Sequence, residues 1–268
     1  MLAAVVSVQT GAALAKNLFA ELGPLGATAV RLGSACLVLL LVIRPRLPAE
    51  GRLLIVGYGL SLGVMNLSFY LALDRIPLGA AVTVEFLGPL AVAVIGSRRR
   101  RDAAVAVLAG LGILLLARGG SSLDPTGLAL AALASACWAG YILLSSAVGK
   151  VVQGGTPLAL AMVVAVAVTV PFGAGTAIHA DAGVLLAGAA VGLLSSVIPY
   201  SLELEALRTL PPRVFGVLLS LEPAAAALAG LVFLSESLAV RQWTGVACVV
   251  VASAAATLSS RPAAPAPD

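Results

Sequence analysis

The stretch LGATAVRLGSACLVLLLVI, residues Leu25–Ile43, is apolar except for Arg31 and is followed by Arg44-Pro45-Arg46. A helix of about 20 residues crosses the hydrocarbon core of a bilayer, and this stretch has that length. Nine further segments of the same kind occupy most of the chain, separated by short breaks rich in proline, glycine or charge. The pattern predicts an all-α integral membrane protein with ten transmembrane helices, over residues 1–20, 25–43, 53–73, 78–97, 103–118, 127–148, 157–177, 183–207, 213–234 and 241–259.

The composition excludes several classes of protein. Sixty per cent of the 268 residues are hydrophobic and 10% are charged, which is not the composition of a soluble domain. The three cysteines lie inside apolar segments, so we expect no disulfide framework, and the single histidine, His179, leaves no metal or nucleotide motif. Basic residues are spread between the segments, which argues against nucleic-acid binding. We expect no cofactor, no metal and no catalytic constellation.

The basic residues between the segments predict the orientation in the membrane. If both termini are cytoplasmic, eleven Lys and Arg residues fall on the inner side, and four fall on the outer side, namely Lys16, Arg75, Arg118 and Arg241. The excess of positive charge marks the cytoplasmic side, so both ends are expected inside. We interpret the segment that opens at Met1 as the first span and not as a signal peptide. The Pro/Ala-rich tail, 261–268, is expected to be disordered.

The two halves of the chain show a weak internal repeat. Residues 57–96 align with residues 191–230 at a constant offset of 134, and ten of the 40 positions match, including Pro77 with Pro211 and Pro89 with Pro223. We therefore expect two homologous halves, 1–120 with helices one to five and 121–260 with helices six to ten. Five is an odd number of crossings, so the halves would have opposite topology. Inverted repeats around a site near the bilayer midplane are typical of secondary transporters.

Five short stretches carry a resemblance to a known family: VQTGAALAK at 8–16, YGLSLGVMN at 58–66, VEFLGPLAVA at 84–93, PYSLE at 199–203 and SLEPA at 220–224. In this order, over nearly the whole chain, they resemble the amino-acid exporters of the EamA-type branch of the drug/metabolite transporter superfamily. The resemblance implies export of small amino acids, threonine and homoserine foremost, coupled to the proton gradient across the bacterial inner membrane. The stretches that contain Glu85 and Pro199 carry the amino-acid expectation.

Two carboxyl groups are predicted at membrane depth. Glu85 and Glu222 lie near the middle of corresponding helices, where a charged side chain costs about 2.5–3.5 kcal/mol on insertion scales. Pro89 removes the hydrogen bond to the Glu85 carbonyl, and Pro223 frees the carbonyl of Leu219. A carboxylate beside a freed carbonyl suits a substrate ammonium or a coupling proton. The alternative is a glutamic acid that holds the bundle together through a hydrogen bond to a neighbouring helix.

Two basic residues complement these carboxyl groups. Arg31 lies about a third of the way into its helix, and Lys16 lies near the outer end of the first one. Either side chain is a candidate for binding the carboxylate of a substrate. Lys16 would otherwise extend to the membrane interface, and Arg31 would otherwise form an internal salt bridge or cap a carbonyl group.

Two polar stripes are candidates for lining a passage. Asn66 and Tyr70 are four residues apart on one helical face, and Ser196, Tyr200 and Glu203 follow an i, i+4, i+7 pattern on the partner helix of the repeat. Alternatively, these side chains form hydrogen bonds between helices, and Glu203 is close enough to the inner surface to be solvated.

Three other functions stay open at this point. The same fold exports other metabolites, drug-like cations or purines, and a passive channel would share the span pattern. An integral-membrane enzyme would need a catalytic constellation at one depth, which is not visible. The expected partners are a small amino acid, protons and the lipid bilayer, and no pattern indicates the oligomeric state.

Overall fold

The computed structural model describes residues 1–95, 100–117, 123–199, 202 and 212–259, and these residues form helices and short connections without any strand. The helices are α1 (Leu2–Asn17), α2 (Phe19–Ile43), α3 (Arg52–Leu73), α4 (Leu78–Glu85), α5 (Leu87–Ile95), α6 (Arg100–Ala117), α7 (Pro125–Gly149), α8 (Thr156–Ala177), α9 (Ala182–Gly192), the π-helix η1 (Leu193–Val197), α11 (Pro212–Leu219), α12 (Glu222–Leu234) and α13 (Val240–Ser259). Each of the ten predicted segments contains helical structure, which confirms the all-α prediction.

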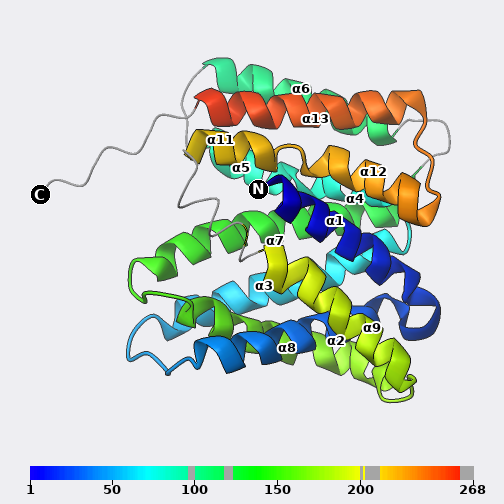
Figure 1. Cartoon of the computed structure of the whole chain (residues 1–268). Coiled ribbons are helices and arrows are strands. Elements are labelled where there is room, and N and C mark those ends of the chain that lie inside the picture. Colours follow the sequence, from blue (N-terminus) through cyan, green and yellow to red (C-terminus); the bar gives the residue numbers. More distant parts are fainter. Residues whose placement is uncertain (96–99, 118–122, 200–201, 203–211, 260–268) are drawn as a thin grey trace, which may run out of the picture.

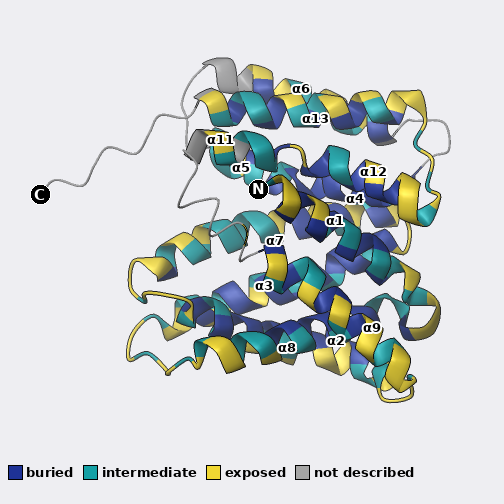
Figure 2. Cartoon of the chain, in the orientation of Figure 1, coloured by how far each residue is buried: buried dark blue, intermediate teal, exposed yellow. Residues whose placement is uncertain are grey.

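Several helices have the length and composition of membrane spans. Five are long and apolar enough to cross a bilayer, namely Phe19–Ile43, Arg52–Leu73, Pro125–Gly149, Thr156–Ala177 and Val217–Leu234. Shorter apolar helices cover Leu78–Val94, Ala104–Leu116 and Ala182–Val197. Large hydrophobic side chains such as Leu41, Phe172 and Val240 are exposed, and exposed residues run along the outer helices in Figure 2. This surface suits contact with lipid.

The helices run side by side in one bundle. In Figure 1, α6 and α13 lie together along one edge, α2 and α8 lie along the other, and α1, α3, α4, α7 and α12 lie between them. We call the end of the bundle where α1 and α3 finish and α4, α7 and α9 begin the Lys16 end. A buried apolar core occupies the interior toward this end, formed mainly by residues of α1, α3 and α4.

The boundary between the first two helices differs from the prediction. The turn falls at Leu18, and α2 starts at Phe19 and continues across a kink at Gly23, whose φ of 65° favours glycine. Pro24 follows inside the helix, so the expected break is a kink and not a loop. The Leu22 carbonyl at the kink accepts a hydrogen bond from Thr176 Oγ1 at 2.8 Å, which ties the kink to the end of α8.

Two of the predicted helices are broken at matching positions. The ranges of α4 and α11 are each eight residues long, and they differ by the offset of 134 found in the sequence. The first break falls at Phe86, three residues before Pro89, and the second falls at Ser220 and Leu221, just before Pro223. Because proline lacks the donor N–H, each break lies where the preceding turn loses a hydrogen bond. The two breaks lie beside the predicted carboxyl groups.

Candidate functional site

A cavity of about 330 Å³ lies between the two broken helices and the rest of the bundle. Its volume falls within the usual range of small-molecule sites. Apolar and aromatic side chains form most of the wall, and the polar ones are Gln9, Arg31, Asn66, Tyr70, Glu85, Ser195, Ser196 and Glu222. Five of the eight predicted site residues therefore meet here: Arg31, Asn66, Tyr70, Glu85 and Glu222.

Arg31 is held in the cavity wall by neutral groups. Its Nη2 donates to Asn66 Oδ1, its Nη1 donates to Ser195 Oγ at 3.3 Å, and its Cζ lies 4.8 Å from the centre of the Tyr70 ring. Asn66 is oriented in turn by its Nδ2, which donates to the Leu62 carbonyl at 2.8 Å. The Arg31 residue is only 8% exposed, and no carboxylate of the described residues lies within ion-pair distance of it. The predicted internal salt bridge is therefore not seen, and the positive charge faces the cavity without a paired anion in the described part of the chain.

The two predicted carboxyl groups both line the cavity, and each lies at the end of a half-helix. Glu85 is the last residue of α4 and is 8% exposed, whereas Glu222 is the first residue of α12 and is 6% exposed. Both side chains line the same cavity as Arg31. One cation and two acidic groups thus lie around a single small volume.

A π-helical turn brings two serines to the wall. Residues Leu193–Val197 form η1 at the end of α9, and Ser195 and Ser196 both line the cavity. Ser7 Oγ donates to the Leu194 carbonyl at 2.6 Å, and Ser195 Oγ donates to the Val191 carbonyl at 2.7 Å. α1 approaches closely, since a Cβ atom on Gly11 would lie 2.8 Å from Ser195 Cβ. Such π turns are frequent at functional sites.

The π turn was not predicted from the sequence. Residues 183–207 were expected to form one regular α-helix, with Ser196, Tyr200 and Glu203 on a single face. In the structure, the helix changes from α to π at Leu193–Val197. Ser196 lies at the cavity, whereas Tyr200 and Glu203 lie outside the described residues.

Gln9 belongs to the wall and was not among the predicted site residues. Three buried polar atoms of the wall, Gln9 Oε1, Arg31 Nε and the Tyr70 hydroxyl, have no hydrogen-bond partner within the described ranges. An unpaired buried polar group costs about 1–3 kcal/mol, so a polar ligand that pairs with these atoms recovers that energy. The sequence did contain a sign that Gln9 belongs to a polar site, because this residue interrupts the apolar first segment. Trp138 and Tyr141 also line the cavity, and the sequence contained no comparable sign of that.

Lys16 does not line the cavity. Its Nζ donates to Glu236 Oε1 at 2.6 Å and to the Ile76 carbonyl at 3.1 Å, beyond the packed core at the Lys16 end. The side chain therefore neither lies at the site nor extends freely to the membrane interface. Its partner comes from the connection after α12, which is 220 positions away in the chain.

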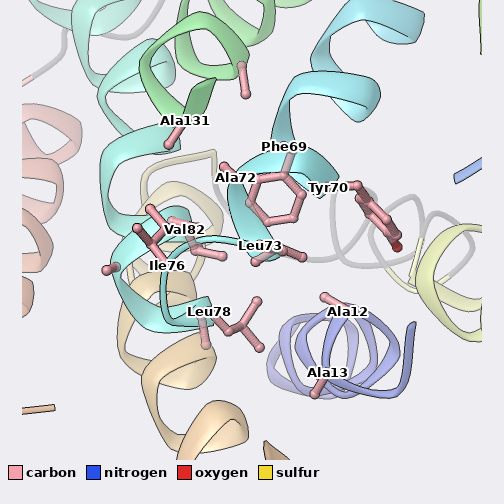
Figure 3. Packing of buried hydrophobic residues seen from close by; sticks show 14 of the residues in the cluster. Ala12, Ala13, Phe69, Tyr70, Ala72, Leu73, Ile76, Leu78, Val82 and Ala131 are labelled. Atoms are coloured by element: carbon pink, nitrogen blue, oxygen red, sulfur yellow. The ribbon is translucent and has the colours of Figure 1, made fainter. Parts of the chain in front are cut away.

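The core separates the cavity from the Lys16 end. Ala12, Phe69, Tyr70 and Val82 belong both to the cavity wall and to the buried core. Figure 3 shows these side chains packed with Leu73 and neighbouring residues between α1, α3 and α4. Tyr70 also contacts the rings of Phe19 and Phe69, with centroids 5.8 and 6.0 Å away. In the arrangement seen here, side chains fill the interior on that side of the cavity.

Comparison with known proteins agrees with this arrangement. The profile of the EamA-like transporter family matches residues 125–258. The threonine/homoserine exporter RhtA of Salmonella typhimurium strain LT2 is 45% identical over 271 residues, which cover 97% of this chain and 91% of that protein. RhtA of Escherichia coli K12 is 44% identical over 269 residues, with the same two coverages. A solved crystal structure that is 20% identical has the same fold, with a TM-score of 0.61 over 95% of this chain and 94% of that one.

The match extends over nearly the full length of this chain and of these relatives. The relatives are transporters and not enzymes, and the cavity lies inside a helical membrane bundle as a transport site requires. The chain therefore belongs to the EamA-like transporter family and is a membrane transport protein.

Proposed function

We propose that this protein exports small amino acids, with threonine and homoserine as the foremost substrates, across the bacterial inner membrane. The observation that carries the proposal is a cavity whose wall holds two carboxyl groups and a guanidinium that has no ion-pair partner among the described residues. An amino acid carries a carboxylate and an ammonium, so it needs a cation and an anion close together. The relatives at 44–45% identity are threonine/homoserine exporters, which supports this cargo.

The roles of the residues follow from their charges. Arg31 binds the substrate carboxylate, because its guanidinium is fixed by Asn66 and Ser195 while its Nε has no partner in the described part of the chain. Glu85 and Glu222 bind the ammonium or carry the coupling proton. Gln9 Oε1 and the Tyr70 hydroxyl, which have no hydrogen-bond partner among the described residues, bind the hydroxyl group of threonine or homoserine. That Tyr200 and Glu203 also line the cavity stays a prediction from the sequence.

The transport cycle that we propose uses two inverted halves, 1–120 and 121–260, that move against each other around the cavity, with both termini in the cytoplasm. The equal lengths of α4 and α11 at the offset of 134 support the repeat. Export against a concentration gradient needs an energy source, and the two buried carboxyl groups support coupling to protons.

The test is counterflow of labelled threonine in proteoliposomes with an imposed pH step. We expect uptake that depends on the pH step and is abolished by Glu85→Gln, whereas the exposed carboxyl variant Glu21→Gln transports like the wild type. Unchanged uptake in Glu85→Gln would remove Glu85 from the mechanism. Transport that persists with an uncoupler would indicate a passive channel.

The cargo is tested separately in cells. We expect expression of the gene to permit growth at toxic concentrations of threonine and homoserine. If growth is not improved while another metabolite, a drug-like cation or a purine is exported, the fold assignment stands and the proposed cargo is wrong.

A further inference from the structure

A second polar cluster lies at the Lys16 end, outside the cavity. Lys16 Nζ donates to Glu236 Oε1 at 2.6 Å and to the Ile76 carbonyl at 3.1 Å, and Glu236 Oε2 accepts a hydrogen bond from the Leu78 N–H at 2.7 Å. We call these four groups the α4 clamp. They join the end of α1, the connection after α12 and the first turn of α4.

The α4 clamp holds one end of the half-helix that carries Glu85. Leu78 is the first residue of α4 and Glu85 is its last, and the break at Phe86 separates it from α5. An eight-residue helix is about 12 Å long and moves as a short rigid unit. A shift of the clamped end therefore moves the carboxyl group in the cavity.

The contact between α4 and α12 strengthens this connection. A Cβ atom on Gly79 would lie 2.6 Å from Ala227 Cα, so the two backbones are in close contact at the first turn of α4. Glu236 lies only two residues beyond the end of α12, after Ser235 in the left-handed conformation with a φ of 55°. α4 is thus positioned by α12 through both packing and the Glu236 carboxylate.

The α4 clamp differs from the other ion pair at the same end. The side chains of Lys16 and Glu236 are 20% and 15% exposed, whereas those of Arg75 and Asp124 are 46% and 32% exposed. Exposed pairs contribute little because water competes with them. The α4 clamp is shielded, and it joins α1 to α4 over the packed core that separates the cavity from this end.

We propose that Glu236, paired with Lys16, is a positioning residue of the transport cycle. The pair holds α4, and with it Glu85, in the arrangement seen here, which is closed toward the Lys16 end. α1 must separate from α4 for the cavity to open at that end, so the pair breaks once in each cycle. The inference rests on the proposed function only in that the chain transports by alternating access, and it does not depend on the cargo.

Thiol labelling tests the inference without any substrate. Cys36, Cys137 and Cys248 are replaced by alanine, and Ala12→Cys in the cavity wall reports access to a membrane-impermeant maleimide applied from the Lys16 end. Glu236→Gln keeps an acceptor for the Leu78 N–H and removes the ion pair. We expect its labelling rate to rise by roughly fivefold or more, because the open state is populated more often.

Matched variants give this experiment its control. Lys16→Gln breaks the same pair from the other side and is expected to raise labelling in the same way, whereas Arg75→Gln breaks the exposed pair and leaves labelling unchanged. Labelling that is unchanged in both Glu236→Gln and Lys16→Gln, or that rises equally in Arg75→Gln, would overturn the inference.

Cross-linking tests the requirement that the pair separates. In the same background, Lys16→Cys with Glu236→Cys is bridged by a short bis-methanethiosulfonate reagent. We expect counterflow to fall by about tenfold or more after bridging and to recover when the bridge is reduced. Bridged protein that transports as fast as reduced protein would show that the two segments do not need to part. If the wild type does not carry threonine, the labelling result still stands and only the proposed cargo fails.

Discussion

The half-helix pairs α4–α5 and α11–α12 are broken at corresponding positions, but they carry their carboxyl groups on opposite sides of the break. Glu85 is the last residue before the break at Phe86, and Glu222 is the first residue after the break at Ser220 and Leu221. At the offset of 134, Glu85 corresponds to Leu219 and Glu222 corresponds to Gly88. The offset of 134 thus relates the two helix breaks without relating the two carboxyl groups.

This difference places the two carboxyl groups in different fields. The first turn of a helix carries a partial positive charge and the last turn a partial negative charge. The first turn of α12 therefore favours an anion at Glu222, whereas Glu85 lies between the last turn of α4, which opposes an anion, and the first turn of α5, which favours one. We propose on this basis that Glu222 stays an anion that binds the ammonium, and that Glu85 takes up and releases the coupling proton.

The largest expected effect separates the two glutamates. We expect Glu85→Gln to lower proton-driven threonine efflux by about tenfold or more, which corresponds to ~1.4 kcal/mol, and to remove its pH dependence. Glu222→Gln should weaken the apparent affinity for threonine and leave the pH dependence in place. Efflux from proteoliposomes, measured at several threonine concentrations between about pH 6 and pH 8, gives the apparent affinity and the pH dependence of each variant. Identical pH profiles for the two variants would contradict the division of roles.

Removing the prolines tests the breaks themselves. Pro89→Ala restores a donor for the Glu85 carbonyl, and Pro223→Ala restores one for Leu219, so both favour continuous helices. Pro89 lines the cavity and Pro223 does not. We therefore expect transport to fall by roughly fivefold for Pro89→Ala and roughly twofold for Pro223→Ala, at equal abundance in the membrane. A larger loss for Pro223→Ala would mean that the break before α12 matters more.

A smaller effect is expected from the packing of α4. Gly79→Ala forces a Cβ atom against Ala227, and such overpacking costs about 1–3 kcal/mol, so the melting temperature in detergent should fall by a few degrees. Gly110→Ala in α6 is the control, because a Cβ atom there meets nothing within 4 Å. A melting temperature for Gly79→Ala equal to that of the control would show that α4 is free to move away from α12.

The smallest effect is expected at the start of α7. The Thr126 N–H, followed by Arg75, lowers the pKa of the exposed Asp124 that caps this helix. The contribution to stability is present above the ordinary pKa of an aspartate and is lost as the pH falls through the lowered pKa. We expect Asp124→Asn to leave efflux near neutral pH unchanged. Its threonine efflux is the reference value for the substitutions in the two broken helices. A loss of efflux as large as that of Glu85→Gln would contradict this expectation.

Much of the fold was predictable from residues whose effect is local. Segments such as Leu25–Ile43 can be recognised as membrane helices from the sequence, because length and apolarity are sufficient to place a helix in a bilayer. Arg31, Glu85 and Glu222 stood out for the same reason, since an ionisable residue in such a segment is costly wherever the helix packs. The match of Pro89 with Pro223 predicted freed carbonyl groups at Glu85 and Leu219, and the structure breaks both helices next to these residues.

The assignment of partners was decided only by the tertiary structure. Lys16 pairs with Glu236 across 220 positions of chain, and the Ser7 hydroxyl binds the Leu194 carbonyl across 187, contacts that no local pattern encodes. The π turn at Leu193–Val197 and the place of Gln9 in the cavity wall depend on how the helices rotate and approach, which is set by side-chain packing between helices. Length and hydropathy determine that a segment spans the membrane, whereas the face that it turns toward the cavity depends on its neighbours.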